Sequence, residues 1–309
     1  MSSGTGIVDT GSGPVLDEGP DVAVDRPARG REVRNVVATV LVTASFAIAI
    51  VPLVWVVWTV LSKGSSLLFD PSWWTNSQQG ITARREGGGA YHAIVGTVLQ
   101  AAVCGLISVP IGVFTAIYLV EYGRGRFARV VSFMVDILTG VPSIVAALFI
   151  YAVWVTTLEF DRVGFAVSLS LVLLMIPVIV RSTEEMLKLV PNELREAAYA
   201  LGVPTWITIS RVVLPTAFSG IVTGVLLGLA RVMGETAPLL ILGPYAKSIN
   251  FNLFNDFMAA LPTMINQDRT ESLAPAVART WAAALTLIVI VLLLNVAGRL
   301  VARRFKPRG

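Results

Sequence analysis

Two residues of opposite charge, Arg231 and Glu235, are spaced one helical turn apart within a 26-residue apolar stretch, Ala217 to Leu242. A charge at the centre of a bilayer costs roughly 2.5–3.5 kcal/mol on insertion scales, so such residues usually face a protein interior or a water-filled path. The chemistry that this pair supports is the binding and passage of a charged solute.

Three glycines precede this pair: Gly220, Gly224 and Gly228 lead to Arg231 and Glu235 in steps of four, four, three and four residues. Residues at these spacings share one stripe of a helix. A stripe of small residues lets a second membrane helix approach closely. We therefore expect the glycines to pack at a helix interface and the charges to open onto that interface or a cavity. The alternative is a plain helix ion pair, worth about a few tenths of a kcal/mol and less in this Arg-first order.

Other reactive side chains are sparse. The single Cys104 excludes an intrachain disulfide and a cysteine metal cluster, and the only histidine, His92, is expected to be structural. Asp136 fits either a transport role or a charge at the membrane boundary. The segment Gly243 to Ser248 has Ala246 where a nucleotide-binding P-loop requires glycine. We therefore expect no catalytic residue, no metal site and no cofactor bound by this chain.

The elements that must position these residues are membrane-spanning helices. Of the 309 residues, 55% are hydrophobic and 14% are charged. Six apolar runs are long enough to cross about 30 Å of hydrocarbon, at residues 36–61, 93–120, 130–155, 163–180, 217–242 and 281–302. These runs are much longer than the roughly ten-residue strands of a membrane β-barrel. The sequence therefore predicts an all-α integral membrane protein with six transmembrane helices.

Lysine and arginine counts give the orientation of these helices. With the N-terminus inside, the cytoplasmic segments hold fifteen such residues and the external segments seven. Both termini are therefore expected in the cytoplasm, and the net charge of +4 needs no nucleic acid to explain it. The expected organisation is a disordered cytoplasmic tail (1–31), a first transmembrane helix (32–62), an external loop (63–92), a helical transmembrane domain (93–302) and a basic cytoplasmic tail (303–309).

The loop at residues 190–215, between the fourth and fifth spans, has the pattern of two short helices. Ala197 and Ala198 lie on the apolar face of the first helix, and Gly202 is placed to end that helix as a C-cap. Pro215 is expected to close the second helix. Two such helices could form a compact docking site for another protein, although an amphipathic connector lying on the membrane surface has a similar composition.

This loop resembles the EAA loop of bacterial ABC importer permeases over about 20 residues, from Glu196-Ala197-Ala198 through Gly202 to Leu214-Pro215. In that family the loop forms a coupling helix seated in a groove of the cytoplasmic ATPase. The resemblance implies that Glu196 and Gly202 shape the loop and that Ala197 and Ala198 give it a close-packing surface. It also implies the MetI-like helix bundle of type I ABC importers, with ATP and Mg²⁺ bound by the partner ATPase.

Two further segments resemble the PstA family of phosphate-specific permeases: Gly140 to Val145 and Arg231 to Pro238. The resemblance implies a permease subunit of an ATP-driven phosphate importer in the bacterial plasma membrane. Its partners would be the sister permease PstC, two copies of the ATPase PstB and the extracytoplasmic phosphate-binding protein PstS. The forked donors of a guanidinium suit phosphate oxygens, so Arg231 would be a transient ligand or gate. Glu235 would hold the guanidinium in register and weaken its field.

The alternative is a secondary transporter or channel for an anion, with Arg231 and Glu235 forming part of an ion or proton relay. Secondary transporters often carry inverted repeats, and the two halves of this sequence show no convincing duplication. Uptake that proceeds without ATP or partner subunits would favour this alternative.

Overall fold

The part of the protein that the structure describes consists of helices and loops. The computed structural model describes residues 29–304, and this range contains no β-strand. The chain divides into two compact units, with the boundary between Trp55 and Val56. Helix α1, Arg29–Leu68, crosses this boundary and contains Pro52. Most of the predicted N-terminal tail, residues 1–28, lies outside the described range, as do residues 305–309 of the predicted C-terminal tail.

Five described helices are long and apolar enough to cross a membrane, and a sharply bent pair provides a sixth candidate span. The spans are α1, α3 (Tyr91–Ile117), the pair α4 (Gly125–Gly140) and α5 (Ser143–Ile150), α6 (Gly164–Lys188), α9 (Leu214–Met233) and α12 (Ala274–Arg304). The shorter helices are α2 (Pro71–Thr75), α7 (Asn192–Ala200), α8 (Thr205–Thr208), α10 (Ala237–Leu242) and α11 (Leu261–Asp268). Three π-helical turns are η1 (Tyr118–Tyr122), η2 (Tyr151–Thr157) and η3 (Ile209–Val213). The predicted all-α fold with six apolar spans is confirmed.

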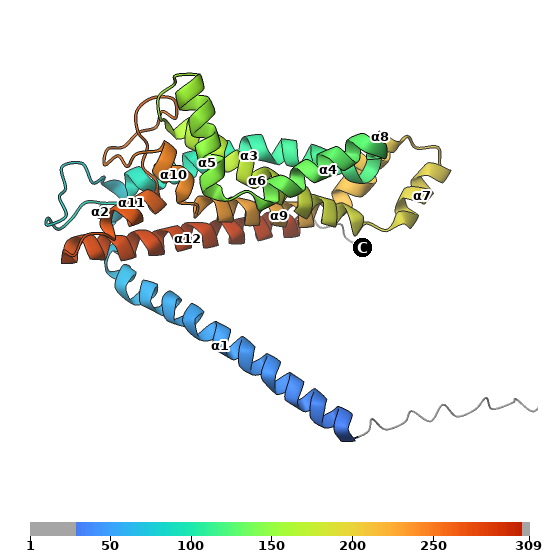
Figure 1. Ribbon diagram of the computed structural model, residues 1–309, viewed down its shortest axis with the longest axis horizontal. Coiled ribbons are helices and arrows are strands. Elements are labelled where there is room, and N and C mark those ends of the chain that lie inside the picture. The colour runs from blue at the N-terminus through green and yellow to red at the C-terminus, as the bar shows by residue number, and fades with distance from the viewer. Residues whose placement is uncertain (1–28, 305–309) are drawn as a thin grey trace, which may run out of the picture. The chain divides into compact units, whose positions relative to one another are not determined.

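Helix α6 forms the centre of the bundle in the second unit. It packs against α3, α4, α5 and α9, and α9 in turn packs against α12 (Figure 1). The most apolar window of α6 is 61% buried, against 33% for α3 and 17% for α12. Gly112 allows α3 to approach α6 closely, because a Cβ atom there would lie 2.6 Å from Cγ2 of Ile179 on α6. The core therefore forms where the other helices pack against α6.

The third predicted span, residues 130–155, is not one continuous helix. Helix α4 ends at Gly140, Val141 and Pro142 have extended backbone angles, and the next helical segment leaves at 106°. Proline lacks the N–H that would continue the helical hydrogen bonds, and it drives the preceding residue out of the helical region. Pro110 in α3 and Pro177 in α6 cause no such break.

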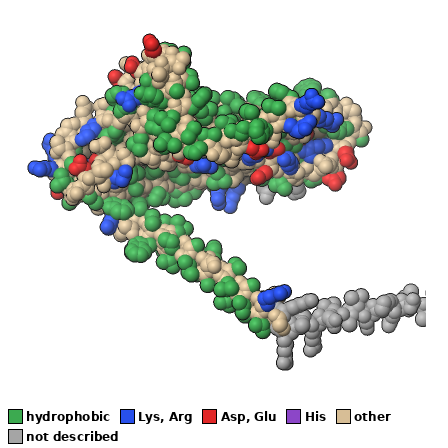
Figure 2. All heavy atoms as spheres, viewed as in Figure 1, with side chains coloured by type: hydrophobic (Ala, Val, Ile, Leu, Met, Phe, Trp, Pro, Cys, Tyr) green, Lys and Arg blue, Asp and Glu red, His purple; other side chains and the backbone are tan. Residues whose placement is uncertain are grey.

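Hydrophobic and charged side chains occupy different parts of the surface of the second unit. Figure 2 shows hydrophobic side chains over most of its middle and charged side chains mainly towards its two ends. One of these ends carries α7 and α8, and the other carries α2 and α11 (Figure 1). This distribution is the one that a membrane-spanning bundle requires, because charged groups are costly within the hydrocarbon region.

Candidate functional site

The fifth predicted span, residues 217–242, is interrupted between its two charges. Helix α9 ends at Met233, and Glu235 and Thr236 lie in a break before α10 begins at Ala237. Pro238 stands in the first turn of α10, where its missing N–H is tolerated, and it has no N–H to offer the carbonyl of Gly234. The expectation of one helix carrying both charges is wrong, since only Arg231 is helical.

Arg231 lies in the last turn of α9 with its side chain largely uncovered. The side chain is 66% exposed and that of Glu235 is 20% exposed. Arg231 Nε and Glu235 Oε1 are 3.9 Å apart, which is an ion pair but too long for a hydrogen bond. Within residues 29–304 this guanidinium forms no hydrogen bond to another side chain or backbone carbonyl, so its donors are available to another molecule.

The two interrupted spans meet. Helix α5, which follows the break at Val141 and Pro142, packs against α10, which follows the break at Glu235. The first N–H groups of each helix have no acceptor within that helix. Membrane transporters commonly place such interrupted helices at the solute path. The helices that follow the two breaks therefore pack against each other.

The glycine stripe of α9 faces α6. A Cβ atom at Gly220 would lie 2.2 Å from Met186 Sδ, and one at Gly224 would lie 2.5 Å from Ser182 Oγ. Gly228 is less crowded, because the nearest side-chain atom would be 3.6 Å away, on Met175. The close approach of α9 to α6 therefore depends on the first two glycines more than on the third.

An ion cluster that the sequence interpretation missed ties α4 to α6. Arg181 donates to Glu184 Oε2 at 2.6 Å, to Ser132 Oγ at 3.1 Å and to Asp136. Lys188 adds a second cation at 3.0 Å from Glu184 Oε1. The helical spacing of Arg181, Glu184 and Lys188 is visible in the sequence, but their link to Asp136, 45 residues earlier, is not. Asp136 thus fixes the α4 half of the broken span onto α6.

The segment between α6 and α9 contains the predicted first helix, α7. Gly202 follows it with φ of +74°, and its N–H donates to the Tyr199 carbonyl at 2.9 Å. The Val203 N–H donates to the Ala198 carbonyl at 3.1 Å, which completes a Schellman cap. Glu196 and Ala197 are exposed and Ala198 is buried. The large apolar side chains that α7 and its cap leave exposed are Leu194, Tyr199 and Leu201.

The predicted second helix does not close at Pro215. Helix α8 runs through η3 into α9, and this continuous helical stretch extends from Thr205 to Met233. Pro215 falls in the first turn after η3. A π-helical turn shifts the hydrogen-bond register locally, so the missing proline N–H does not stop the helix.

Arg195 anchors α7 to the bundle. The sequence indicated only that Arg195 is one of the cytoplasmic positive charges that set the orientation, and it did not indicate this contact. Its Nη2 lies 2.9 Å from Glu121 Oε1 of η1, and the two side chains are 13% and 5% exposed. The same guanidinium donates to the carbonyls of Val190 at 2.7 Å and Leu187 at 2.9 Å. Movement of α7 would therefore be passed to the ends of both α3 and α6.

A second buried ion pair lies at the opposite end of the bundle. Arg279 Nε is 3.3 Å from Asp268 Oδ2, with side chains 4% and 7% exposed. The other guanidinium nitrogens donate to the carbonyls of Arg85 at 2.9 Å and Thr82 at 3.4 Å. Gln78 also donates to Asp268 at 3.3 Å. This network fastens the loop after α2 onto α11 and α12.

Tyr245 extends the same network to the start of α3. Its hydroxyl donates to Gln78 Oε1 at 2.8 Å and lies 3.1 Å from Nε2 of the buried His92. Burial raises the pKa of the Tyr245 hydroxyl, and the negative charge of Asp268 raises it further. The buried His92 side chain is thus held by packing and by its contact with Tyr245. Groups of three or more side chains that could hold a metal ion are absent from residues 29–304.

Comparisons with known proteins agree with this arrangement. The family described as "Binding-protein-dependent transport system inner membrane component" matches residues 108–307. A Mycobacterium tuberculosis (strain H37Rv) protein, "Phosphate transport system permease protein PstA 1", is 50% identical over 287 residues, covering 93% of both chains. The Haemophilus influenzae protein "Phosphate transport system permease protein PstA" is 39% identical over 271 residues, covering 87% of this chain and 94% of its own.

Solved structures share the fold at lower identity. A chain of the inward-facing MetNI methionine ABC transporter superposes with a TM-score of 0.56 at 20% identity, covering 71% of this chain and 95% of its own. A chain of a bacterial alginate ABC transporter, in complex with an alginate-bound periplasmic protein, gives 0.61 at 14% identity and covers 89% and 97%. The helix arrangement is therefore that of ABC importer permeases.

Proposed function

The chain belongs to the family of binding-protein-dependent transport system inner membrane components, and from this premise we propose that it is a permease subunit of an ATP-driven importer of inorganic phosphate. The observation that carries the proposal is its similarity, over nearly the whole chain, to proteins named as phosphate transport permeases. The family and the apolar spans make it a multi-pass inner membrane protein.

Arg231 is the residue that we propose for contact with phosphate. A guanidinium is a cation whose forked donors match phosphate oxygens. Arg231 is mostly exposed and lies beside the break between α9 and α10. Glu235, at 3.9 Å, lowers the net field of the cation without occupying its donors. Such a loose pair supports binding that is strong enough to admit phosphate and weak enough to release it.

We propose that the uncovered face at Arg231 is completed by the sister permease PstC. A cation within the hydrocarbon region would be costly if lipid covered it, whereas a second permease can enclose a wet path. In this assembly the chain supplies half of the pathway, and phosphate is delivered from outside by the binding protein PstS.

In this assembly, α7 would transmit the conformational change driven by ATP hydrolysis to the helix bundle. Glu196, Ala197, Ala198 and Gly202 form the loop that couples to a pair of PstB ATPases, which bind ATP and Mg²⁺. The exposed Leu194, Tyr199 and Leu201 side chains offer an apolar surface for this contact. Arg195 would pass the motion to η1 and to the end of α6 through Glu121 and two backbone carbonyls. This chain would perform no covalent chemistry itself.

The orientation that fits this assembly has both termini in the cytoplasm. It follows from the excess of arginine and lysine in the segments on that side. It places α7 at the ATPases and the network of Arg279 on the side that faces the binding protein.

Phosphate uptake into vesicles that contain the chain with PstC, PstB and PstS tests the proposal. Uptake should require ATP, and Arg231→Gln should lower it about 10- to 100-fold, the range for a lost hydrogen bond to a charged group. ATP hydrolysis and assembly should persist in that variant. Glu196→Lys should instead reduce the ATPase response, because it alters the coupling loop.

Arg126→Gln is the matched control for Arg231→Gln. Arg126 is an exposed arginine in the first turn of α4, outside the loop 190–215, and its loss should leave uptake within about twofold. Uptake that continued without ATP or PstB would replace the proposal with a secondary transporter or channel.

A further inference from the structure

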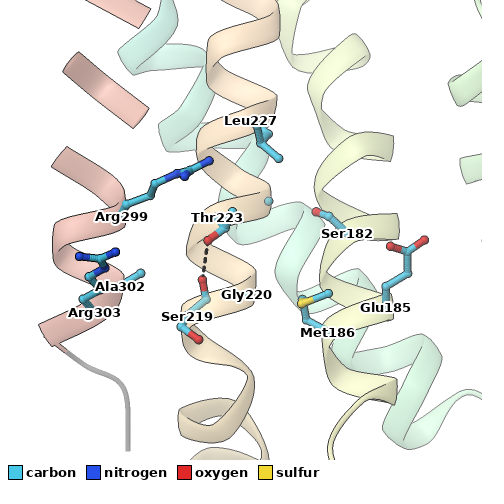
Figure 3. A pocket seen from close by; sticks show the side chains of 11 residues that line it. Ser182, Glu185, Met186, Ser219, Gly220, Thr223, Leu227, Arg299, Ala302 and Arg303 are labelled. Carbon is cyan, nitrogen blue, oxygen red and sulfur yellow. Dashed lines mark hydrogen bonds between the residues drawn. The ribbon is translucent and has the colours of Figure 1, made fainter. Parts of the chain in front are cut away.

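A groove on the second unit lies between α6, α9 and α12, separate from the Arg231 break. It has a volume of about 590 Å³, within the roughly 300–1,000 Å³ common for small-molecule sites. Figure 3 shows α9 as its floor, with α12 on one side and α6 on the other. The floor is low because Gly220 and Gly224 have no side chains.

Two arginines of α12 line one wall. Arg299 and Arg303 are both exposed, and neither forms an ion pair with any residue in the described range 29–304. In Figure 3 the Arg299 side chain extends from α12 towards α9. Glu185, the one carboxylate of the lining, belongs to the opposite wall. The groove therefore offers two unneutralised guanidinium groups on one side.

The rest of the lining is mixed in a way that suits an amphiphile. Ser182, Ser219 and Thr223 contribute hydroxyl groups. Thr223 donates to the Ser219 carbonyl at 2.8 Å, and Ser182 donates to the Ile179 carbonyl at 3.2 Å, so both oxygens still have lone pairs for a donor. Met186 and Leu227 add apolar surface beside these polar groups. A free inorganic anion would leave that apolar surface without a partner.

The position of the groove along the helices fits a membrane boundary. Its residues come from the last turns of α6, from α9 between Ser219 and Leu227, and from the last turns of α12. The end of α6 and the start of α9 are the ends nearest α7 in the chain, and the end of α12 lies beside them in the groove. The proposed function places α7, and with it this end of the bundle, on the cytoplasmic side. Basic pockets between transmembrane helices on that side are suited to anionic lipid headgroups.

We propose that this groove binds the phosphate of an anionic membrane lipid. Arg299 and Arg303 pair with the phosphodiester, Ser182 and Thr223 accept hydrogen bonds from headgroup hydroxyls, and Met186 and Leu227 contact the start of an acyl chain. The assignment to the cytoplasmic leaflet rests on the proposed function, whereas the binding itself does not. Neither Arg231 nor Glu235 lines the groove, so losing the lipid need not remove Arg231 from its position.

Native mass spectrometry of the purified transporter complex, titrated with phosphatidylglycerol, tests this proposal. Intact protein should retain phosphatidylglycerol at least about tenfold more strongly than the double variant Arg299→Gln/Arg303→Gln. Zwitterionic phosphatidylcholine should show no such difference. Arg124→Gln/Arg126→Gln removes the same charge near the start of α4, outside the groove, and should retain the lipid as intact protein does.

A second variant keeps the charges and fills the space. Ser219→Phe places a ring in the groove while leaving both arginines, and it should weaken phosphatidylglycerol binding at least about tenfold as well. Equal binding by intact protein and both groove variants would overturn the proposal. Displacement of the lipid by millimolar inorganic phosphate would show that the groove takes free phosphate and would overturn the lipid assignment. Neither result depends on phosphate uptake, so the proposed function is tested separately.

Discussion

Arg279 and Arg231 each have one acidic partner, at 3.3 Å and 3.9 Å, but their surroundings differ. The Arg279 side chain is 4% exposed and also donates to two backbone carbonyls, so its hydrogen bonds are made within the protein. The Arg231 side chain is 66% exposed and makes no such bonds to residues 29–304. A saturated, buried arginine holds a structure together, whereas a loosely paired, exposed one remains free for a ligand. The comparison contrasts an arginine whose donors are used within the protein with one whose donors stay available for the proposed contact with phosphate.

The largest expected effect is on the buried pair. Arg279→Met should lower the free energy of unfolding by about 3–5 kcal/mol, because it leaves the Asp268 carboxylate buried without its cation. Thermal unfolding of the purified complex measures the loss. Lys247→Met is the control, since Lys247 donates to the Ile81 carbonyl from an exposed position and its removal should change stability little. An unchanged unfolding temperature for Arg279→Met would contradict the structural role.

Breaking the pair of Arg195 and Glu121 should give the next largest loss of stability. This pair is expected to serve both stability and transport. It is largely buried, though less so than the Arg279 pair, and it connects α7, the proposed coupling helix, to η1. Glu121→Gln should cost about 1.5–3 kcal/mol of stability, the range for a hydrogen bond to a charged group. It should also lower the phosphate moved per ATP hydrolysed.

The double variant Arg195→Met/Glu121→Met distinguishes these two consequences. It removes both charges, so stability should recover in part, while the ratio of transport to hydrolysis should stay low. Recovery of both quantities together would mean that the pair only stabilises the fold.

Overpacking an uncharged helix contact should lower the free energy of unfolding by a smaller amount. Gly224→Ala would place a Cβ atom 2.5 Å from Ser182 Oγ, and overpacking of this kind costs about 1–3 kcal/mol. Ser182→Gly should restore stability in the same background. Gly228→Ala is the matched control, because its nearest neighbour would be 3.6 Å away; replacing a helical glycine there should be neutral or slightly stabilising. Equal losses at Gly224 and Gly228 would argue against the close α6 to α9 contact.

The smallest effect on folding is expected at Arg231. Arg231→Gln should change the free energy of unfolding by less than about 0.5 kcal/mol, as expected for an exposed side chain, even though phosphate uptake falls. Arg231→Lys keeps the charge but loses the forked donors, so it should recover only part of the uptake. A large loss of stability in Arg231→Gln would remove the contrast with Arg279.

Prolines show how far the sequence could predict the fold. Pro110, Pro142 and Pro177 all lie within predicted spans, and each could kink a helix. Only Pro142 accompanies a break, together with Pro238 in the fifth span, while α3 and α6 continue through their prolines. The apolar runs could not distinguish these cases. Packing decides whether neighbouring groups satisfy the freed carbonyls or the chain turns away.

The candidate site was predicted in part for the same reason. Arg231 and Glu235 were visible because a charge in an apolar run is unusual, and Gly202 was visible because a cap requires a residue that tolerates positive φ. The partners of Arg195 and Arg181 lie 74 and 45 residues away in the sequence. No local pattern indicates such pairs, because they form only when separate helices meet.

The sequence by itself determined the number of apolar spans, the helical class and the presence of the cap at Gly202. These features follow from hydrophobic length and from the conformational freedom of single residues, which are local properties. Only the tertiary structure decided where two spans break, that α5 meets α10, and which arginines are saturated. Those outcomes depend on burial and on contacts between distant segments, because the cost of an unpaired charge or carbonyl is set by what surrounds it.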